Sequence, residues 1–128
     1  MKASAPKSWL SFVFLLALAL AAQAEFRGAW ISAVHNLDWP SKKGLPAAQQ
    51  KAELVRLLDS AKSLGLTDLF FQVRPEGDAL YRSPLEPWSR FLTGTQGKDP
   101  GYDPLAFCIS EAGKRGMRVP AEIGRAHV

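Results

Sequence analysis

The sequence is poor in cysteine and histidine, and this excludes several kinds of protein. Cys108 is the single cysteine, so no disulfide can form within the chain and a hydrophobic core must stabilise it. Histidine occurs only at His35 and His127, and neither has a second ligand at metal-binding spacing. The first expected strand–helix turn also lacks a G-x-G-x-x-G run, which removes the usual indication of a dinucleotide. We therefore expect no metal and no cofactor.

The sequence also has little excess charge. Its 128 residues carry 16 Lys and Arg against 12 Asp and Glu, a net charge of +4. Loss of Lys2 and Lys7 with an N-terminal leader leaves 14 basic against 12 acidic residues, a net charge of +2. The remaining basic residues are scattered along the chain instead of forming a block. This distribution gives no support to nucleic-acid binding.

The first 24 residues have the pattern of a secretory signal peptide. Lys2 and Lys7 precede an apolar run over residues 9–22, and a small-x-small cleavage site ends at Ala24. The run is shorter than the roughly 20 residues that span a bilayer. We expect cleavage after Ala24, and a mature protein that is secreted, either periplasmic or extracellular, with no stable membrane anchor.

The end of the chain does not continue the pattern that precedes it. Residues 123–128 match one reading frame of a widely used sequencing adapter, and Glu122 falls at the junction. We expect residues 122–128 to be a non-native tail from adapter read-through, so His127 is not counted as a ligand or base. Residues 25–121 are then the expected native part of the mature chain, and whether Pro120 and Ala121 are native stays open.

Residues 25–121 alternate between expected strands and expected helices. Short apolar segments typical of buried strands occupy residues 27–32, 67–73 and 117–121. Helical spacing of apolar residues marks residues 46–64 and the segment from Asp103 to Gly116. This order predicts an α/β protein with a parallel sheet, either a doubly wound sheet or part of a barrel.

The second expected helix presents an apolar stripe whose members lie three and four residues apart. The stripe consists of Leu105, Cys108, Ile109 and Ala112. Nothing near Cys108 in the sequence would lower the pKa of its thiol, so we expect a buried structural cysteine and not a nucleophile.

A family resemblance favours the barrel. Three runs carry it: RGAWIS, NLDWPSKKGL and LFFQVRPEGDALYRSPLEPWSRFLTGTQGKDPGYDPLAF. They resemble the glycoside-hydrolase-like 10 family of bacterial envelope proteins over residues 26–119. The resemblance implies the N-terminal part of a (β/α)₈ TIM barrel, truncated after about three strands and two helices. It implies hydrolysis of glycosidic bonds in cell-wall or envelope glycans, such as a peptidoglycan-derived polysaccharide. Glu76 and Pro120 depart from the small residue and the histidine that the family would have there.

The candidate substrate-binding residues lie near the carboxyl ends of the expected strands, where barrel proteins build their sites. Gln72 and Arg74 share one face and offer hydrogen bonds that suit hydroxyl, N-acetyl or carboxylate groups. Aromatic rings suit the C–H faces of sugars. The full candidate set is Trp30, Asn36, Gln72, Arg74, Asp78, Tyr81 and Trp88. Each has a structural alternative, namely ring packing, a polar pair at the rim or a capped turn.

The catalytic residues are expected beyond residue 121. Glycoside hydrolysis generally uses two carboxyl groups at defined separation, and Glu76 and Asp78 do not form a clear pair. Three functions stay open: a secreted glycoside hydrolase as the full-length protein, a barrel that binds glycans without cutting them, and an inactive fragment. The bond cleaved, the stereochemistry and the oligomeric state stay open as well.

Overall fold

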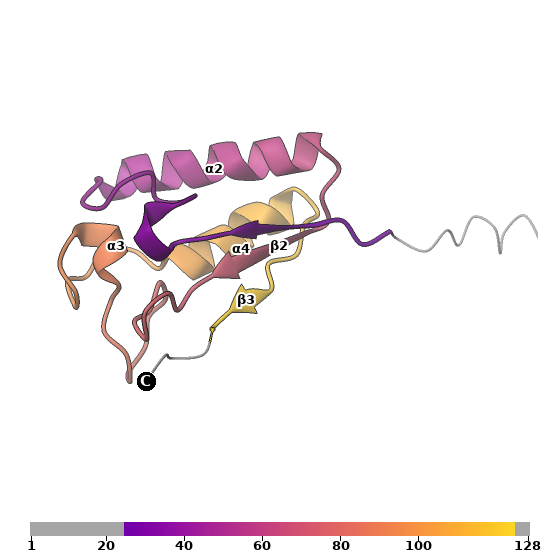
Figure 1. Ribbon diagram of the computed structural model, residues 1–128. Helices are drawn as coiled ribbons and strands as arrows, with labels where there is room; N and C mark the ends of the chain where they lie inside the picture. The colour runs from indigo at the N-terminus through magenta and orange to yellow at the C-terminus, as the bar shows by residue number, and fades with distance from the viewer. Residues whose placement is uncertain (1–24, 125–128) are drawn as a thin grey trace, which may run out of the picture.

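The computed structural model describes residues 25–124, so the predicted signal peptide and positions 125–128 of the predicted tail lie outside the described residues. Strands and helices alternate as predicted (Figure 1). The elements are β1 (Gly28–Ile31), the 3₁₀ turn η1 (Val34–Asn36), α2 (Ala47–Ser63), β2 (Asp68–Gln72), α3 (Arg90–Thr93), α4 (Pro104–Lys114) and β3 (Ala121–Glu122). The predicted α/β class is confirmed.

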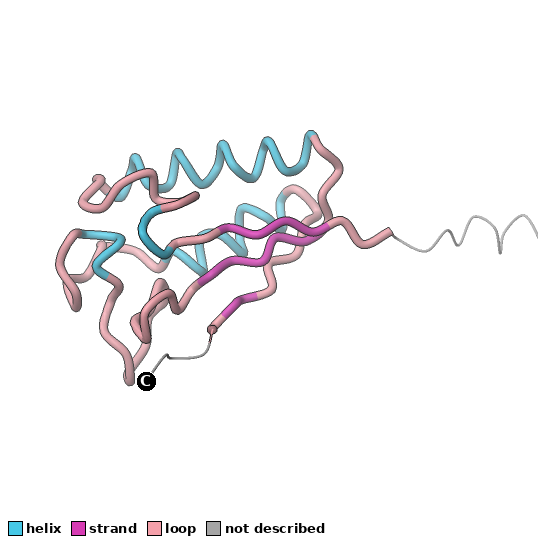
Figure 2. Tube along the Cα trace, in the orientation of Figure 1, coloured by secondary structure: helices cyan, strands magenta, loops and turns pink. Residues whose placement is uncertain are grey.

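The three strands form a parallel sheet in the order β1-β2-β3 (Figure 2). Ile31 pairs with Phe71, and Gln72 pairs with Glu122. The third strand begins at Ala121, later than the predicted residue 117. The cause is Pro120, which has no N–H to donate to the sheet. Its carbonyl still accepts the N–H of Phe71 at 3.0 Å, so backbone pairing continues on both sides of the proline.

The core lies between the sheet and helices α2 and α4. Alternate strand residues point toward the helices, and Leu69, Phe71 and Val73 of the second strand segment are all buried. From α2, the buried apolar side chains are Leu54, Leu58 and Ala61, while Val55 is only partly buried. Helix α4 begins directly after Asp103, as predicted, and the Asp103 side chain caps it by accepting the N–H of Ala106 at 2.9 Å.

One member of the predicted stripe on α4 is exposed. Cys108 and Ala112 are fully buried, but Ile109 is 51% exposed. The Lys51 ammonium of α2 lies 5.4 Å from the Phe107 ring centroid, so Phe107 marks the side of α4 that faces α2. Residues two apart on a helix point in nearly opposite directions, which places Ile109 on the flank away from α2. The prediction that Ile109 belongs to the buried stripe was therefore wrong.

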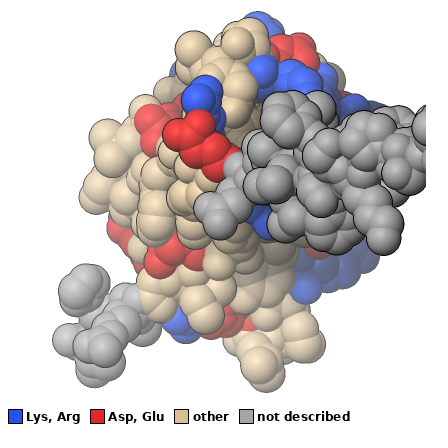
Figure 3. Space-filling model, turned by 90° about the vertical axis from the view of Figure 1, so that its right-hand side faces the viewer, with Lys and Arg blue, Asp and Glu red and all other residues tan. Residues whose placement is uncertain are grey.

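The surface of the described residues carries mixed charge. Figure 3 shows acidic and basic side chains interspersed on the side of the molecule where the strands begin. Helices α2 and α4 account for part of this mixture, since Arg115 of the α4 terminus pairs with Asp59 of α2 at 2.7 Å. Within residues 25–124, no helix has both the length and the apolar character needed to cross a membrane.

Candidate functional site

The carboxyl ends of β1 and β2 lie at the same edge of the sheet because the strands are parallel (Figure 1). Turn η1 follows β1 at this edge, and the long segment over residues 73–102 follows β2. That segment is not structureless, since it contains the short helix α3. In this class of fold, loops at this edge build binding and catalytic sites.

The Gln72 side chain, at the end of β2, forms hydrogen bonds with the residues that follow β1. Its Oε1 accepts the Ser32 hydroxyl at 3.1 Å and the N–H groups of Ala33 and Val34 at 3.0 Å each. These bonds fix the start of η1 against the end of β2. The amide oxygen that could have accepted a sugar hydroxyl is thus already engaged within the protein.

Turn η1 holds two consecutive residues in the left-handed region. His35 has φ 53° and Asn36 has φ 54°, although neither is glycine. Such conformations cost about 1–3 kcal/mol each and persist where surrounding contacts enforce them. The Asn36 Nδ2 donates to the carbonyls of Pro40 at 2.9 Å and Phe91 at 3.0 Å. The His35 ring packs edge-on against Phe91, with centroids 5.8 Å apart.

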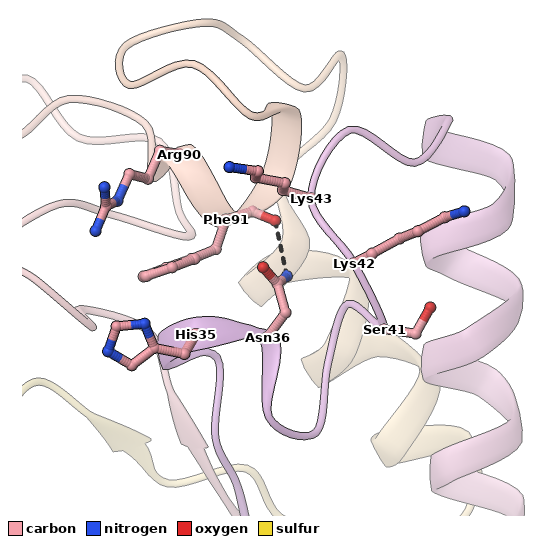
Figure 4. A pocket seen from close by; sticks show the side chains of 7 residues that line it. All are labelled: His35, Asn36, Ser41, Lys42, Lys43, Arg90 and Phe91. Carbon is pink, nitrogen blue, oxygen red and sulfur yellow. Dashed lines mark hydrogen bonds between the residues drawn. The ribbon is translucent and has the colours of Figure 1, made fainter.

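A pocket of about 430 Å³ opens beside this turn (Figure 4). Its lining residues come from η1, from the segment before α2 and from α3. They are His35, Asn36, Ser41, Lys42, Lys43, Arg90 and Phe91. Of the predicted substrate-binding residues, only Asn36 is among them. The lining contains three permanent cations and no carboxylate, which makes this pocket basic.

Arg74 and Tyr81 both bond to the carboxylate of Glu86, which was not among the predicted site residues. The Arg74 Nε forms an ion pair with Glu86, and the Tyr81 hydroxyl donates to the other Glu86 oxygen at 3.3 Å. Burial raises the pKa of Tyr81, and the negative charge of Glu86 adds to the rise. Glu86 carries no motif, so only the folded loop shows that it orients two predicted site residues.

Asp78 lies inside the loop that follows β2. It is 0% exposed, and its Oδ1 accepts the N–H of Glu76 at 3.1 Å. Its Oδ2 has no hydrogen-bond partner among the described residues. Glu76 pairs in turn with Arg90 of α3 at 2.9 Å. The hydrogen bond from the Glu76 N–H fits the structural alternative in which Asp78 caps a turn.

The three tryptophans within residues 25–124 occupy different settings. Trp30 is 52% exposed on the sheet face opposite the helices, where it stacks on Phe70 with centroids 5.9 Å apart. Trp88 is partly buried against the core. Trp39 is fully buried, and its Nε1 donates to the carbonyl of Gln50 at 2.9 Å. The exposed ring of Trp30 is therefore not at the pocket but on the open face of the sheet.

Gln50 is a second polar residue that sequence patterns could not single out. Its side chain is 1% exposed, and its Nε2 donates to the carbonyls of Leu45 at 2.8 Å and Leu92 at 3.0 Å. Its Oε1 accepts the Tyr102 hydroxyl at 2.9 Å, and burial raises the pKa of that tyrosine. These bonds hold α2 and α3 together behind the pocket. Within residues 25–124, His, Cys, Asp and Glu form no cluster that could hold a metal ion.

The parallel strand–helix order, with polar loops gathered at the carboxyl edge, defines an α/β protein whose site is built from strand-end loops. The chain belongs to the Glycosyl hydrolase-like 10 family, whose family model matches residues 25–125. The resemblance noted in the sequence is thereby confirmed.

Two curated relatives support the same assignment. The chain is 52% identical over 97 residues to glycosyl hydrolase YngK of Bacillus subtilis (strain 168), covering 76% of this chain and 19% of that protein. It is 44% identical over 102 residues to glycosyl hydrolase DigH of Escherichia coli (strain K12), covering 74% of this chain and 23% of that protein. The chain thus spans about a fifth of the length of these relatives.

Proposed function

We propose that the full-length protein is a secreted glycoside hydrolase that acts on cell-wall or envelope glycans. Residues 25–121 would supply the first three strands and two helices of a (β/α)₈ barrel. The observation that carries this proposal is the family match over residues 25–125, together with two relatives that are both named glycosyl hydrolases. The parallel sheet and its loop-built edge are compatible with the barrel, as they are with half of a doubly wound sheet.

The acids near the described edge are unsuited to acid catalysis. A general acid must come within hydrogen-bond reach of the glycosidic oxygen that it protonates. Glu86 is held by Arg74, and Glu76 is held by Arg90, so neither carboxyl group is free to donate to a substrate. Asp78 is fully enclosed. We therefore place the catalytic pair on later strands and assign this segment to substrate binding.

The activity is tested with the full-length protein and purified, peptide-free cell-wall glycan strands. Hydrolysis of glycosidic bonds releases new reducing ends, which can be counted over time beside a heat-inactivated sample. Co-sedimentation with the insoluble glycan measures binding separately. Binding without new reducing ends would favour the alternative of a non-catalytic glycan-binding barrel. If the protein neither binds nor cleaves the glycan, the proposal is wrong.

The proposed export is tested separately. Expressed with the natural N-terminus in a bacterium, the protein is expected to lose residues 1–24. The intact mass of the product in the periplasm or medium decides this. A product that keeps Met1 and stays in the membrane would contradict cleavage after Ala24.

A further inference from the structure

The basic pocket beside η1 has charges that the fold itself does not use. Among residues 25–124, neither Lys42 nor Lys43 takes part in an ion pair, whereas Arg90 is paired with Glu76 at 2.9 Å. Arg90 therefore contributes a partly compensated charge, and Lys43 contributes an uncompensated one. A pocket of about 430 Å³ is within the range that holds small ligands.

The two lysines differ in direction although they are neighbours in the chain. In Figure 4, Lys43 extends over Phe91 on the side where Arg90 lies, whereas Lys42 points away toward α2. His35 is exposed on the opposite side of Phe91. Lys43 and Arg90 thus lie on one side of Phe91 and His35 on the other, while Lys42 lines the pocket from the side of α2.

The backbone that carries these groups is held firmly. Both Asn36 amide hydrogens are committed to the carbonyls of Pro40 and Phe91, which joins η1 to α3. The N–H of Gly44 donates to the carbonyl of Leu92 at 3.0 Å, which joins the segment after Lys43 to the same helix. The pocket is therefore assembled from three chain segments that are tied by direct hydrogen bonds. A backbone that is fixed in this way lets a ligand bind with less loss of conformational freedom.

We propose that this pocket binds the carboxylate of an acidic sugar in the glycan, with Lys43 as the main cation and Arg90 as a second. A carboxylate matches these donors in charge and in hydrogen-bonding capacity. It could come from a lactyl ether substituent or from a uronic acid. The inference rests on the proposed function, because it names the class of glycan that the same site takes.

The test uses the full-length protein and three glycans: strands that carry lactyl carboxylates, the same strands after chemical reduction of those carboxylates, and a uronate-containing glycan. Lys43→Met is expected to raise KM for a carboxylated glycan about fivefold, with kcat nearly unchanged, as for loss of an exposed ion pair. The reduced strands should show no such change. Lys62→Met removes the same charge from an exposed lysine of α2 that does not line the pocket, and it should alter KM less than twofold.

The possible outcomes distinguish failure of the proposed carboxylate subsite from failure of the proposed hydrolase activity. If the wild-type protein cleaves glycan and Lys43→Met affects native and reduced strands equally, or affects neither, the carboxylate subsite is wrong while the hydrolase stands. The carboxylated glycan whose KM depends on Lys43 identifies the source of the carboxylate. If the wild-type protein cleaves none of the three, the proposed function fails, and titration calorimetry with the native and reduced strands tests the pocket alone. A preference for native strands that Lys43→Met abolishes would then support the subsite, and its absence would overturn it.

Discussion

The Oε1 atom of Gln72 accepts the backbone N–H of Ala33 at 3.0 Å, which ties the end of β2 to the residue that precedes η1. The same oxygen accepts two further donors from Ser32 and Val34. The strained turn that follows, at His35 and Asn36, is therefore anchored by a side chain from the neighbouring strand. A residue selected as a possible sugar ligand is also a structural centre of the candidate site.

Replacing Gln72 is expected to destabilise the protein because its one side-chain oxygen accepts three hydrogen bonds. Gln72→Leu leaves three part-buried donors without their acceptor and should lower the free energy of unfolding by about 1–3 kcal/mol. Gln72→Glu keeps a carbonyl-type oxygen in place and should cost less. Urea denaturation of the full-length protein, followed by circular dichroism, measures both. Equal losses in the two variants would show that the oxygen is not what stabilises the turn.

Arg74 is expected to contribute to glycan hydrolysis. A hydrogen bond from a charged donor contributes roughly 1.5–3 kcal/mol, so Arg74→Ala should lower kcat/KM about tenfold or more. Because this change leaves Glu86 unpaired, Glu86→Gln serves as the companion variant and shows the effect of losing the ion pair alone. Circular dichroism confirms that each variant is folded. If Arg74→Ala is folded with unchanged kcat/KM, Arg74 serves only to pack the rim.

The protein should become less stable toward unfolding at acidic pH, because Asp68 becomes protonated. Arg118 hydrogen-bonds this carboxylate, Thr67 adds a second hydrogen bond, and together they lower the pKa of Asp68 below its ordinary 3.8. The unfolded chain therefore takes up the proton first as pH falls. The stabilisation is complete above the ordinary pKa and is lost as pH falls below it toward the lowered value.

The measurement for Asp68 is the melting temperature of the full-length protein between pH 6 and pH 3. Asp68→Asn should reduce the fall in melting temperature over this range, and Arg118→Met should do the same because it removes the cause of the lowered pKa. The double variant should differ little from either single one. An unchanged acid dependence in Asp68→Asn would show that other carboxylates account for it.

The elements of the fold could be predicted because their signals are local. The cap at Asp103, the apolar spacing in α2 and the alternation in β2 each lie within a few residues. The start of β3 was predicted too early because Pro120 has no N–H to donate, which interrupts the regular pairing between Arg118 and Ala121 without changing its register. Ile109 was misplaced because helical spacing shows an apolar stripe but not how wide a stripe the neighbouring elements cover.

The site was harder to predict because its contacts join distant parts of the chain. Lys43, Arg90 and His35 line one pocket only because hydrogen bonds draw η1, the segment before α2 and α3 together. Glu86 has no sequence signal that separates it from any other acid in a loop. Asp78 was selected as a loop acid, and its burial depends on how residues 74–89 fold back on themselves. Spacing in the sequence does not determine that path.

Cys108 should be unreactive in the folded protein. Burial raises the pKa of its thiol to about 12, and the thiolate is the species that reacts with disulfide reagents and maleimides. At pH 8, modification should therefore proceed only through unfolding or local opening, at a rate far below that in denaturant.

The matched control is Ile109→Cys in a Cys108→Ala background, which moves the thiol by one residue to a position that is 51% exposed in the wild type. That thiol should react at least tenfold faster under native conditions. Mass spectrometry of timed samples measures both rates. Rapid native modification of Cys108 would mean that α4 does not pack against the sheet as described.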